Sequence, residues 1–244
     1  MKTVFITGCN RGLGLAILKK YVADGYNVIA CIRKFNQEFS DLCVALMKAH
    51  SVDIQILYCD MEIPEEVEQL TAKLETMDGE IDVLINNAGI NVMKPLLYVE
   101  PSDLQETFQV NYFAPVLLTK AIANKMIRDG KGVIVNITSM GSLGHQSGGV
   151  CYDASKSALN QFTISIAREL APFDIRVNAV ACGPMNTDMF AGIAEKGQKN
   201  LIKTTALGRV AEPEEIAEVV YLLTTEQTSY VTGQIIRVDG GAIL

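Results

Sequence analysis

The chain has 244 residues, of which 49% are hydrophobic and 20% charged, and its net charge at pH 7 is −7. This composition is ordinary for a globular protein, and the length is enough for one full α/β core or two small ones. The negative charge, with Lys and Arg scattered along the chain, argues against a nucleic-acid surface.

The cysteines and histidines argue against disulfides and a metal site. Six Cys occur without a C-x-x-C motif, and the two His, His50 and His145, are not part of an H-E-x-x-H motif. This pattern is typical of reduced cytosolic thiols. The apolar start "MKTVFITG" leads directly into glycines, so it predicts a strand rather than a targeting segment, and no apolar run approaches membrane-spanning length. We therefore expect a cytoplasmic protein without a metal or membrane contact.

Apolar runs rich in β-branched residues alternate with amphipathic stretches almost to the end of the chain. The predicted strands are 3–7, 27–32, 53–59, 82–87, 132–138, 175–181 and 234–238, and the predicted helices are 12–25, 36–50, 64–77, 101–129, 150–171 and 212–226. Most strands lack polar alternation, which indicates parallel strands covered on both faces. The pattern predicts one α/β domain over residues 1–244, a Rossmann-type doubly wound, seven-stranded parallel sheet with helices on both faces. The irregular stretch 183–208 is expected to form a mobile substrate lid.

A glycine-rich turn, "TGCNRGLG", follows the first strand. Gly8, Gly12 and Gly14 allow the backbone to approach a pyrophosphate, which would rest on the positive end of the next helix. The spacing is G-x-x-x-G-x-G rather than the commoner G-x-G-x-x-G, and a tight turn without a ligand is the alternative. Its place after the first strand favours nucleotide binding.

The end of the second strand indicates which dinucleotide binds. NAD sites usually place Asp or Glu there, whereas NADP sites use Arg. The sequence "CIRKF" supplies Arg33 and Lys34 without a carboxylate, and Arg11 in the glycine turn adds a further cation. Each Arg alone could be a solvated surface charge, but two that converge favour a 2′-phosphate. We therefore predict NADP(H).

Tyr152 and Lys156 stand four residues apart in "GGVCYDASKSALNQF" and would share one helix face. A nearby cation stabilises a phenolate and so lowers the pKa of a tyrosine, which can then transfer protons. The alternative is an ordinary pair in which the lysine reaches water along its apolar stem.

Pro115 follows Asn111 by four residues within an apolar helical pattern. Because proline has no N–H, it leaves the carbonyl of Asn111 without its helical partner. A bound water is one candidate for that partner, and a simple helix kink is the alternative.

Together these segments resemble the short-chain dehydrogenase/reductase family in its compact single-domain form. The resemblance covers essentially the whole chain and is greatest to the 3-oxoacyl-acyl carrier protein reductases. The motifs that carry it are "TGCNRGLG", "NNAG" (86–89), Asn111 in "QVNYFAP", Ser139 in "ITSM", "YDASK" (152–156), "GPMNTDM" (183–189) and "YVTGQIIRVDGGA".

The resemblance implies an NADP(H)-dependent oxidoreductase that interconverts a ketone and a secondary alcohol, with a catalytic set of four residues. Tyr152 would protonate the ketone oxygen while hydride arrives from the nicotinamide. Ser139 would orient that oxygen, and Lys156 would hold the nicotinamide ribose and lower the pKa of Tyr152. Asn111 would complete a proton relay through a water.

The resemblance also implies the cofactor contacts. They come from the glycine turn, the ends of the second to fourth strands, the catalytic helix and the start of the lid. The implied residues are Gly8, Cys9, Asn10, Arg11, Gly12, Leu13, Gly14, Arg33, Asp60, Met61, Asn87, Ala88, Gly89, Tyr152, Lys156, Met185 and Thr187.

Three alternatives remain open. Sugar-nucleotide epimerases share the Tyr-x-x-x-Lys pair but carry a longer C-terminal substrate domain, whereas this chain ends at Leu244, directly after the last predicted strand. A non-catalytic dinucleotide-binding protein is disfavoured because all four catalytic residues are present. The third alternative is the same enzyme class with a sugar, polyol, steroid or other small ketone as substrate.

The family resemblance raises two questions about partners. Compact members are mostly tetramers, and the apolar patterns 101–129 and 150–171 suit a homotetramer, with a dimer as the alternative. Reductases of acyl carrier protein usually present Arg at two places, which here carry Gly130, near Arg128 and Lys131, and Phe173. Substitute cations could come from the lid, at Lys196, Lys199 and Lys203.

Three residues near the expected site have no assigned role. His145 either lines the substrate mouth or lies in a surface loop. Cys151 is expected to pack inside the protein. Cys182 stands where relatives usually carry the Pro of a Pro-Gly pair, which leaves the rigidity of that turn in question.

Overall fold

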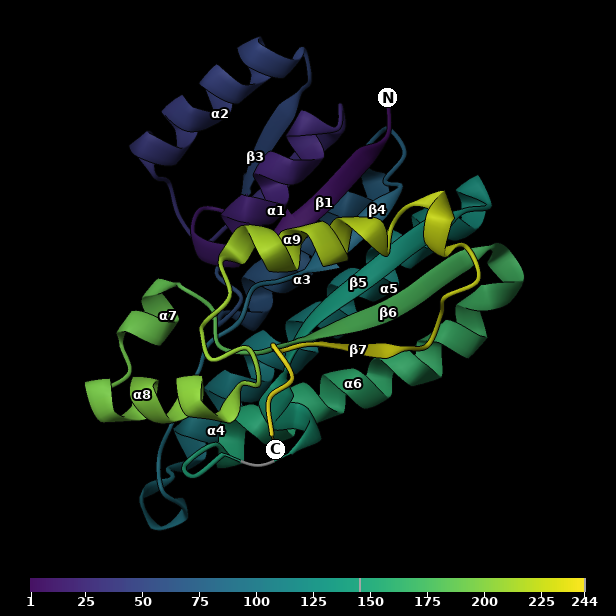
Figure 1. Cartoon of the computed structure of the whole chain (residues 1–244). Helices are drawn as coiled ribbons and strands as arrows, with labels where there is room; N and C mark the ends of the chain where they lie inside the picture. Colours follow the sequence, from purple (N-terminus) through teal and green to yellow (C-terminus); the bar gives the residue numbers. More distant parts are fainter. Residues whose placement is uncertain (145, 244) are drawn as a thin grey trace.

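The protein, described by a computed structural model over residues 1–144 and 146–243, contains one seven-stranded parallel sheet (Figure 1). The strand order is β3-β2-β1-β4-β5-β6-β7. The strands are β1 (Thr3–Thr7), β2 (Asn27–Ile32), β3 (Ile54–Tyr58), β4 (Val83–Asn86), β5 (Gly132–Ser139), β6 (Ile175–Cys182) and β7 (Ile235–Val238). The Rossmann-type fold predicted from the sequence is confirmed, and each strand ends within one residue of its prediction.

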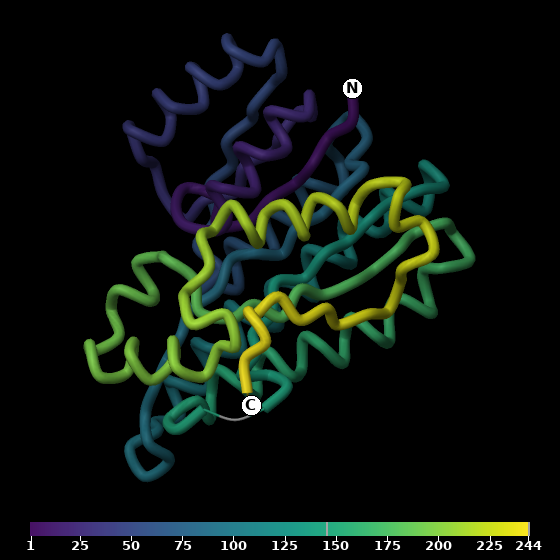
Figure 2. The backbone as a smooth tube through the Cα atoms, in the orientation of Figure 1, coloured from purple at the N-terminus to yellow at the C-terminus, as the bar shows by residue number. Residues whose placement is uncertain are grey.

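Helices cover both faces of this sheet, as the tube in Figure 2 shows. The helices are α1 (Gly12–Ala23), α2 (Gln37–His50), α3 (Pro64–Thr76), α4 (Pro101–Phe108), α5 (Ala114–Asp129), α6 (Val150–Leu170), α7 (Asp188–Ala191), α8 (Glu195–Thr204) and α9 (Pro213–Leu222). Helices α1, α2 and α9 share one hydrophobic core with the sheet, and α3, α5 and α6 share the other. Pro64, Pro101 and Pro213 each occupy a first helical turn, where the missing N–H costs no hydrogen bond.

The helical stretch predicted at 101–129 is divided by a π-helical turn. This turn, η2 (Gln109–Phe113), contains Asn111 and directly precedes Pro115 in α5. The N–H of Ala114 reaches the carbonyl of Gln109, five residues back. Single π-turns are frequent at functional sites. The turn therefore gives Asn111 a backbone setting that a regular helix would not provide.

The sheet also fixes where a ligand can bind. The chain crosses from β3 at one edge to β4 beside β1, so the winding direction reverses between β1 and β4. In open α/β sheets, ligands bind outside the carboxyl ends of the strands at this reversal.

Within the residues described, we find no helix with the length and apolar character needed to cross a membrane.

Candidate active site

A cavity of about 620 Å³ opens at the carboxyl ends of β1, β2, β4, β5 and β6. It brings together almost every residue that the sequence assigned to the site. Those lining it are Gly8, Asn10, Arg11, Gly12, Leu13, Gly14, Arg33, Asp60, Met61, Asn87, Ala88, Gly89, Ser139, Tyr152, Lys156, Met185 and Thr187. The glycine turn and α6, which carries Tyr152 and Lys156, therefore face one shared space.

The glycine turn is held against the loop that follows β4. Gly8 has a φ of +65°, and a Cβ on it would lie 2.9 Å from the Cα of Ala88. A Cβ on Gly14 would lie 2.2 Å from the carbonyl oxygen of Gly8. The side-chain amide of Asn87 donates to the carbonyls of Thr7 and Gly8 at 2.8 and 3.0 Å. Asn87 thus positions the turn, a structural task that the sequence did not reveal.

One residue of the predicted cofactor set does not present its side chain to the cavity. Cys9 lies in the glycine turn, but its side chain is fully buried in the core against α1 and α2. Its thiol contacts the carbonyl of Cys31 at 3.9 Å, and burial raises its pKa far above the ordinary range. Cys9 is therefore a core residue of the turn, and any contact that it makes with a cofactor would come from its backbone.

The two arginines at the cavity are each paired with a carboxylate. Arg33 lies 3.7 Å from Glu62, which follows β3. Arg11 forms a 3.1 Å ion pair with Asp188 of α7, so it links the glycine turn to the lid segment. Sequence inspection of "CIRKF" predicted no carboxylate near Arg33, and Glu62 was missed because it comes from the next strand.

Asp60 and Met61 form the wall beyond β3. The N–H of Asp60 donates to Glu66 at 2.7 Å, and its carboxylate accepts the N–H of Glu62 at 3.1 Å. Met61 is buried and packs in the core beneath this turn. The turn is therefore fixed by these hydrogen bonds and by the packing of the Met61 side chain in the core below it.

Tyr152 lines the cavity near Ser139, at the carboxyl end of β5. Burial raises the pKa of Tyr152 to about 12, although a hydrogen bond with the Ser139 hydroxyl acts to lower it. The spacing of Tyr152 and Lys156 predicted that the pKa of Tyr152 is lowered, and this prediction is wrong for this structure. The reason is that loss of solvation of the phenolate outweighs the stabilising hydrogen bond.

Lys156 lies one helical turn further along α6 and is almost completely buried. Its amine donates a 3.0 Å hydrogen bond to the carbonyl of Ile137. Burial lowers its pKa to about 8. A Cβ on Gly89 would lie 3.2 Å from this nitrogen, so the amine sits directly beneath the "NNAG" segment. The sequence-based alternative, in which the lysine reaches water, is contradicted by this burial.

Asn111 does not line the cavity but supports its wall. Its amide accepts the N–H of Ile90 and donates to the Ile90 carbonyl, both at 2.9 Å. It also donates to the Ser155 hydroxyl at 3.0 Å, and that hydroxyl donates to the Tyr152 carbonyl at 2.7 Å. Ser155 was not singled out in the sequence. The network joins η2, the segment after β4 and α6.

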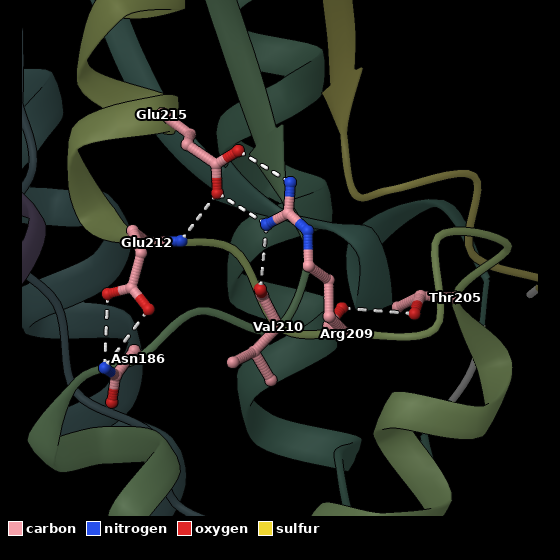
Figure 3. A network of polar contacts seen from close by, with 6 residues as sticks. All are labelled: Asn186, Thr205, Arg209, Val210, Glu212 and Glu215. Carbon is pink, nitrogen blue, oxygen red and sulfur yellow. Dashed lines mark hydrogen bonds and ion pairs between the residues drawn. The ribbon is translucent and has the colours of Figure 1, made fainter.

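The lid segment, residues 183–208, contains α7 and α8, and its apolar side chains Met189, Phe190, Ile193 and Leu201 line the cavity. A polar network connects both ends of this segment to the start of α9 (Figure 3). Arg209 binds Glu215 through two hydrogen bonds of 2.7 and 2.8 Å, and Asn186 donates to Glu212 at 3.2 Å. This network ties the two ends of the segment to α9.

The three unassigned residues have different outcomes. His145 lies outside the described residues. Cys151 is buried, as expected for a packing residue. Cys182 ends β6 and lines the cavity, and burial raises its pKa to about 12. The following turn is held closely, because a Cβ on Gly183 would lie 2.5 Å from the Cα of Asp239.

Within the described residues, no three His, Cys, Asp or Glu side chains are grouped so that they could hold a metal ion.

Comparisons with known proteins identify the family of this chain. The family model described as Enoyl-(Acyl carrier protein) reductase matches residues 8–242. A 3alpha-hydroxysteroid dehydrogenase from Mediterraneibacter gnavus is 38% identical over 243 residues, which cover 99% of this chain and 96% of the relative. The 3-oxoacyl-[acyl-carrier-protein] reductase FabG from Aquifex aeolicus is 37% identical over 246 residues, which cover 98% of this chain and 96% of the relative.

A solved structure is similar over nearly the same length. It is described as an NAD(P) dependent gluconate 5-dehydrogenase from Beutenbergia cavernae with bound NADP at low occupancy. Its TM-score is 0.92 at 29% identity, with 98% of this chain and 96% of that chain covered. The chain belongs to the short-chain dehydrogenase/reductase family and is an oxidoreductase, so the resemblance seen in the motifs is confirmed. The names of these relatives give different substrates. Family membership therefore defines the class of reaction but not the substrate.

Proposed function

We propose that this protein is an NADP(H)-dependent reductase of ketones, with 3-oxoacyl thioesters as its substrate class. The observation that carries the proposal is the single cavity that joins the glycine turn and Arg33 to Ser139, Tyr152 and Lys156. A ligand that spans this cavity would place a phosphate group near Arg33 and a reactive group near Tyr152.

The residues present fit NADP(H). The N-cap residue of α1, Arg11, makes no side-chain cap hydrogen bond, so the first backbone N–H groups of this helix are available to a pyrophosphate, which the positive helix end stabilises. Arg33 is half exposed at the cavity and available to a 2′-phosphate. The structurally similar dehydrogenase was crystallised with NADP. Asp60 and Met61 would flank the adenine, and Met185 and Thr187 would cover the nicotinamide.

The catalytic roles follow from the protonation states of the side chains. With a pKa of about 12, the Tyr152 phenol keeps its proton at neutral pH and can donate it to a ketone oxygen. The Ser139 hydroxyl would donate a second hydrogen bond to that oxygen and orient it. Lys156, whose amine lies beneath Gly89, would bind the ribose and stabilise the phenolate after proton transfer. Bound NADPH supplies the hydride.

Asn111 acts in this proposal by holding the cavity wall. Its amide fixes Ile90 on one side and reaches Tyr152 through Ser155 on the other. Because its side chain is fully engaged, a relay water would have to bind at its backbone carbonyl, which Pro115 leaves without a helical donor.

Five apolar side chains line the cavity in addition to the polar residues Asn91 and Gln146. They are Met140, Met189, Phe190, Ile193 and Leu201. This lining suits an acyl chain and supports the 3-oxoacyl thioester assignment over a sugar or polyol, whose hydroxyl groups would lose hydrogen bonds to water. The same lining, together with the similarity to a 3alpha-hydroxysteroid dehydrogenase, supports a ketosteroid as the second candidate.

Use of acyl carrier protein would be weak and salt-dependent. Phe173 is exposed where carrier-protein reductases usually present an arginine. Lys131 is paired with Glu80 at 3.1 Å, and Lys199 with Glu195 at 2.7 Å. These carboxylates reduce the attraction that the lysines could exert on an acidic partner.

We also propose a homotetramer in the cytoplasm, with residues 183–208 as a lid. Exposed apolar side chains on η2, α4 and α5, namely Leu104, Phe113 and Leu117, and Val150 and Ile164 on α6, would be covered by neighbouring subunits. The six cysteines are free thiols, which suits a reducing compartment.

The experiment that tests the function is a screen of NADPH oxidation against acetoacetyl thioesters, diketones, ketosteroids and keto sugars. We expect the highest kcat/KM with an acetoacetyl thioester. A higher value with a ketosteroid would favour the second candidate. Absence of NADPH oxidation with every ketone would overturn the proposal.

A further inference from the structure

Gln146 lies at the end of the cavity that holds Ser139 and Tyr152. Its backbone is fixed against the start of α6. The N–H of Gln146 donates to the Asp153 carboxylate at 3.1 Å, and its carbonyl accepts the N–H of Gly149 at 2.9 Å. These two hydrogen bonds hold Gln146 in a defined position beside the helical turn that carries Tyr152.

The side chain of Gln146 reaches the segment that follows β5. A Cβ on Gly141 would lie 3.3 Å from the amide carbon of Gln146. The N–H of Gly141 in turn donates to the Ser139 hydroxyl at 3.2 Å. The Gln146 amide therefore lies next to the turn whose hydroxyl is assigned above to the reacting ketone oxygen.

The amide of Gln146 is available to a ligand. The residue is partly exposed, and its side-chain amide has no hydrogen-bond partner among the described residues. By contrast, the amide of Asn87 donates to backbone carbonyls, and the side-chain oxygen of Asn91 is buried. A side-chain amide carries two N–H donors and one carbonyl acceptor. Gln146 can therefore bind a second polar group of a substrate whose ketone lies near Ser139.

The proposed substrate carries such a group close to its ketone. In a 3-oxoacyl thioester, one carbon atom separates the thioester carbonyl from the ketone. In a cavity partly lined by apolar side chains such as Met140 and Phe190, the thioester oxygen would lose hydrogen bonds to water. An N–H donor from Gln146 replaces one of these hydrogen bonds. A ketosteroid with a single ketone has no carbonyl at this spacing and gains nothing from the amide.

We propose that Gln146 is a specificity-determining residue whose side-chain N–H donates to the thioester carbonyl while Ser139 and Tyr152 bind the ketone oxygen. The enzyme thereby favours 1,3-dicarbonyl substrates over ketones that have no second carbonyl. This inference rests on the proposed ketone reductase function and deepens its substrate assignment.

The test compares two ketones that differ in the thioester carbonyl alone. One is the acetoacetyl thioester of N-acetylcysteamine, and the other is the thioether in which a methylene group replaces the thioester carbonyl. The ratio of the two kcat/KM values is measured for each protein. The two ketones differ in chemical reactivity, but this difference is the same for every variant and cancels when the ratios are compared.

Two variants of Gln146 and one control decide the role of the amide. In Gln146→Leu the ratio of thioester to thioether should fall roughly fivefold below the wild-type ratio, as expected for the loss of one hydrogen bond. Gln146→Glu keeps the side-chain length but removes the N–H donors, so its ratio should fall at least as far. Gln55→Leu removes an exposed amide on β3, outside the cavity, and should leave the ratio unchanged. Because both kcat/KM values scale with the amount of folded enzyme, partial unfolding of a variant does not alter its ratio.

A Gln146→Leu ratio within about twofold of the wild-type ratio would overturn the role of Gln146. A Gln146→Glu variant that keeps the wild-type ratio would overturn it as well. Either result, obtained with an enzyme that reduces the thioester, leaves the proposed function in place. If no ketone supports NADPH oxidation, the proposed function fails, and the role of Gln146 fails with it.

Discussion

Replacing Lys156 with Met should make the folded protein more stable at neutral pH while abolishing its activity. Burial lowers the pKa of Lys156 from 10.5 to about 8. Because one pKa unit corresponds to about 1.4 kcal/mol, keeping this ammonium charged in the folded protein costs about 3 kcal/mol at pH 7. Methionine removes that cost but also the hydrogen bond to Ile137, which contributes about 1 kcal/mol. The expected gain is about 2 kcal/mol at pH 7.

The sign of this effect depends on pH. Below pH 8 the lysine is charged in both folded and unfolded states, so the full cost is present. As pH rises from about 8 to 10.5, the folded protein releases its proton before the unfolded chain does, and the cost disappears. The stability difference between Lys156→Met and the wild type should therefore fall close to zero by pH 10.

Urea unfolding of both proteins at pH 7 and pH 10 measures this difference. Lys48→Met, which changes an exposed lysine on α2, should alter the free energy of unfolding by less than about 0.5 kcal/mol at either pH. If Lys156→Met is less stable than the wild type at pH 7, or if its stability differs from the wild type by the same amount at both pH values, burial of the charged lysine does not destabilise the folded protein.

Four further predictions concern the site and the assembly. Tyr152→Phe should bind NADPH normally while kcat falls roughly 10²–10⁴-fold, which steady-state assays and a binding titration measure together. Arg33→Asp should lower the NADPH-over-NADH ratio of kcat/KM about tenfold or more, whereas Glu62→Gln, which removes the carboxylate 3.7 Å away, should tighten NADPH binding. Gly14→Ala should lower the free energy of unfolding in urea by about 1–3 kcal/mol, because the new Cβ would lie 2.2 Å from the Gly8 carbonyl oxygen. In the control Gly192→Ala the new Cβ would lie at ordinary contact distances, so the free energy of unfolding should not fall. Light scattering should give a mass near four chains, and a clean monomer would contradict the proposed assembly.

The strands and the site segments could be predicted from the sequence because their signals are local. Apolar runs without polar alternation mark strands covered on both sides, and the glycine turn after the first strand marks a nucleotide site wherever the rest of the chain folds. The spacing of Tyr152 and Lys156 placed both on one helix face, and the structure confirms that both reach the cavity.

The contacts that tune the site were not predictable, because they join distant parts of the chain. Arg11 and Asp188 are 177 residues apart in sequence and meet only in the folded protein. Glu62 reaches Arg33 because β2 and β3 are neighbours in the sheet. The pKa of Tyr152 depends on how much water the surrounding elements exclude, so the spacing to Lys156 alone predicted the wrong direction.

An assay of cofactor oxidation separates the proposed NADPH-dependent ketone reduction from its alternatives. Purified protein is mixed with an acetoacetyl thioester and either NADPH or NADH, and cofactor oxidation is followed for the wild type and Tyr152→Phe. NADPH should be used in preference to NADH, the alcohol should form in equal amount to the NADPH consumed, and Tyr152→Phe should retain less than about a tenth of the rate. A wild-type preference for NADH, or a Tyr152→Phe variant as fast as the wild type, would contradict the proposed reaction.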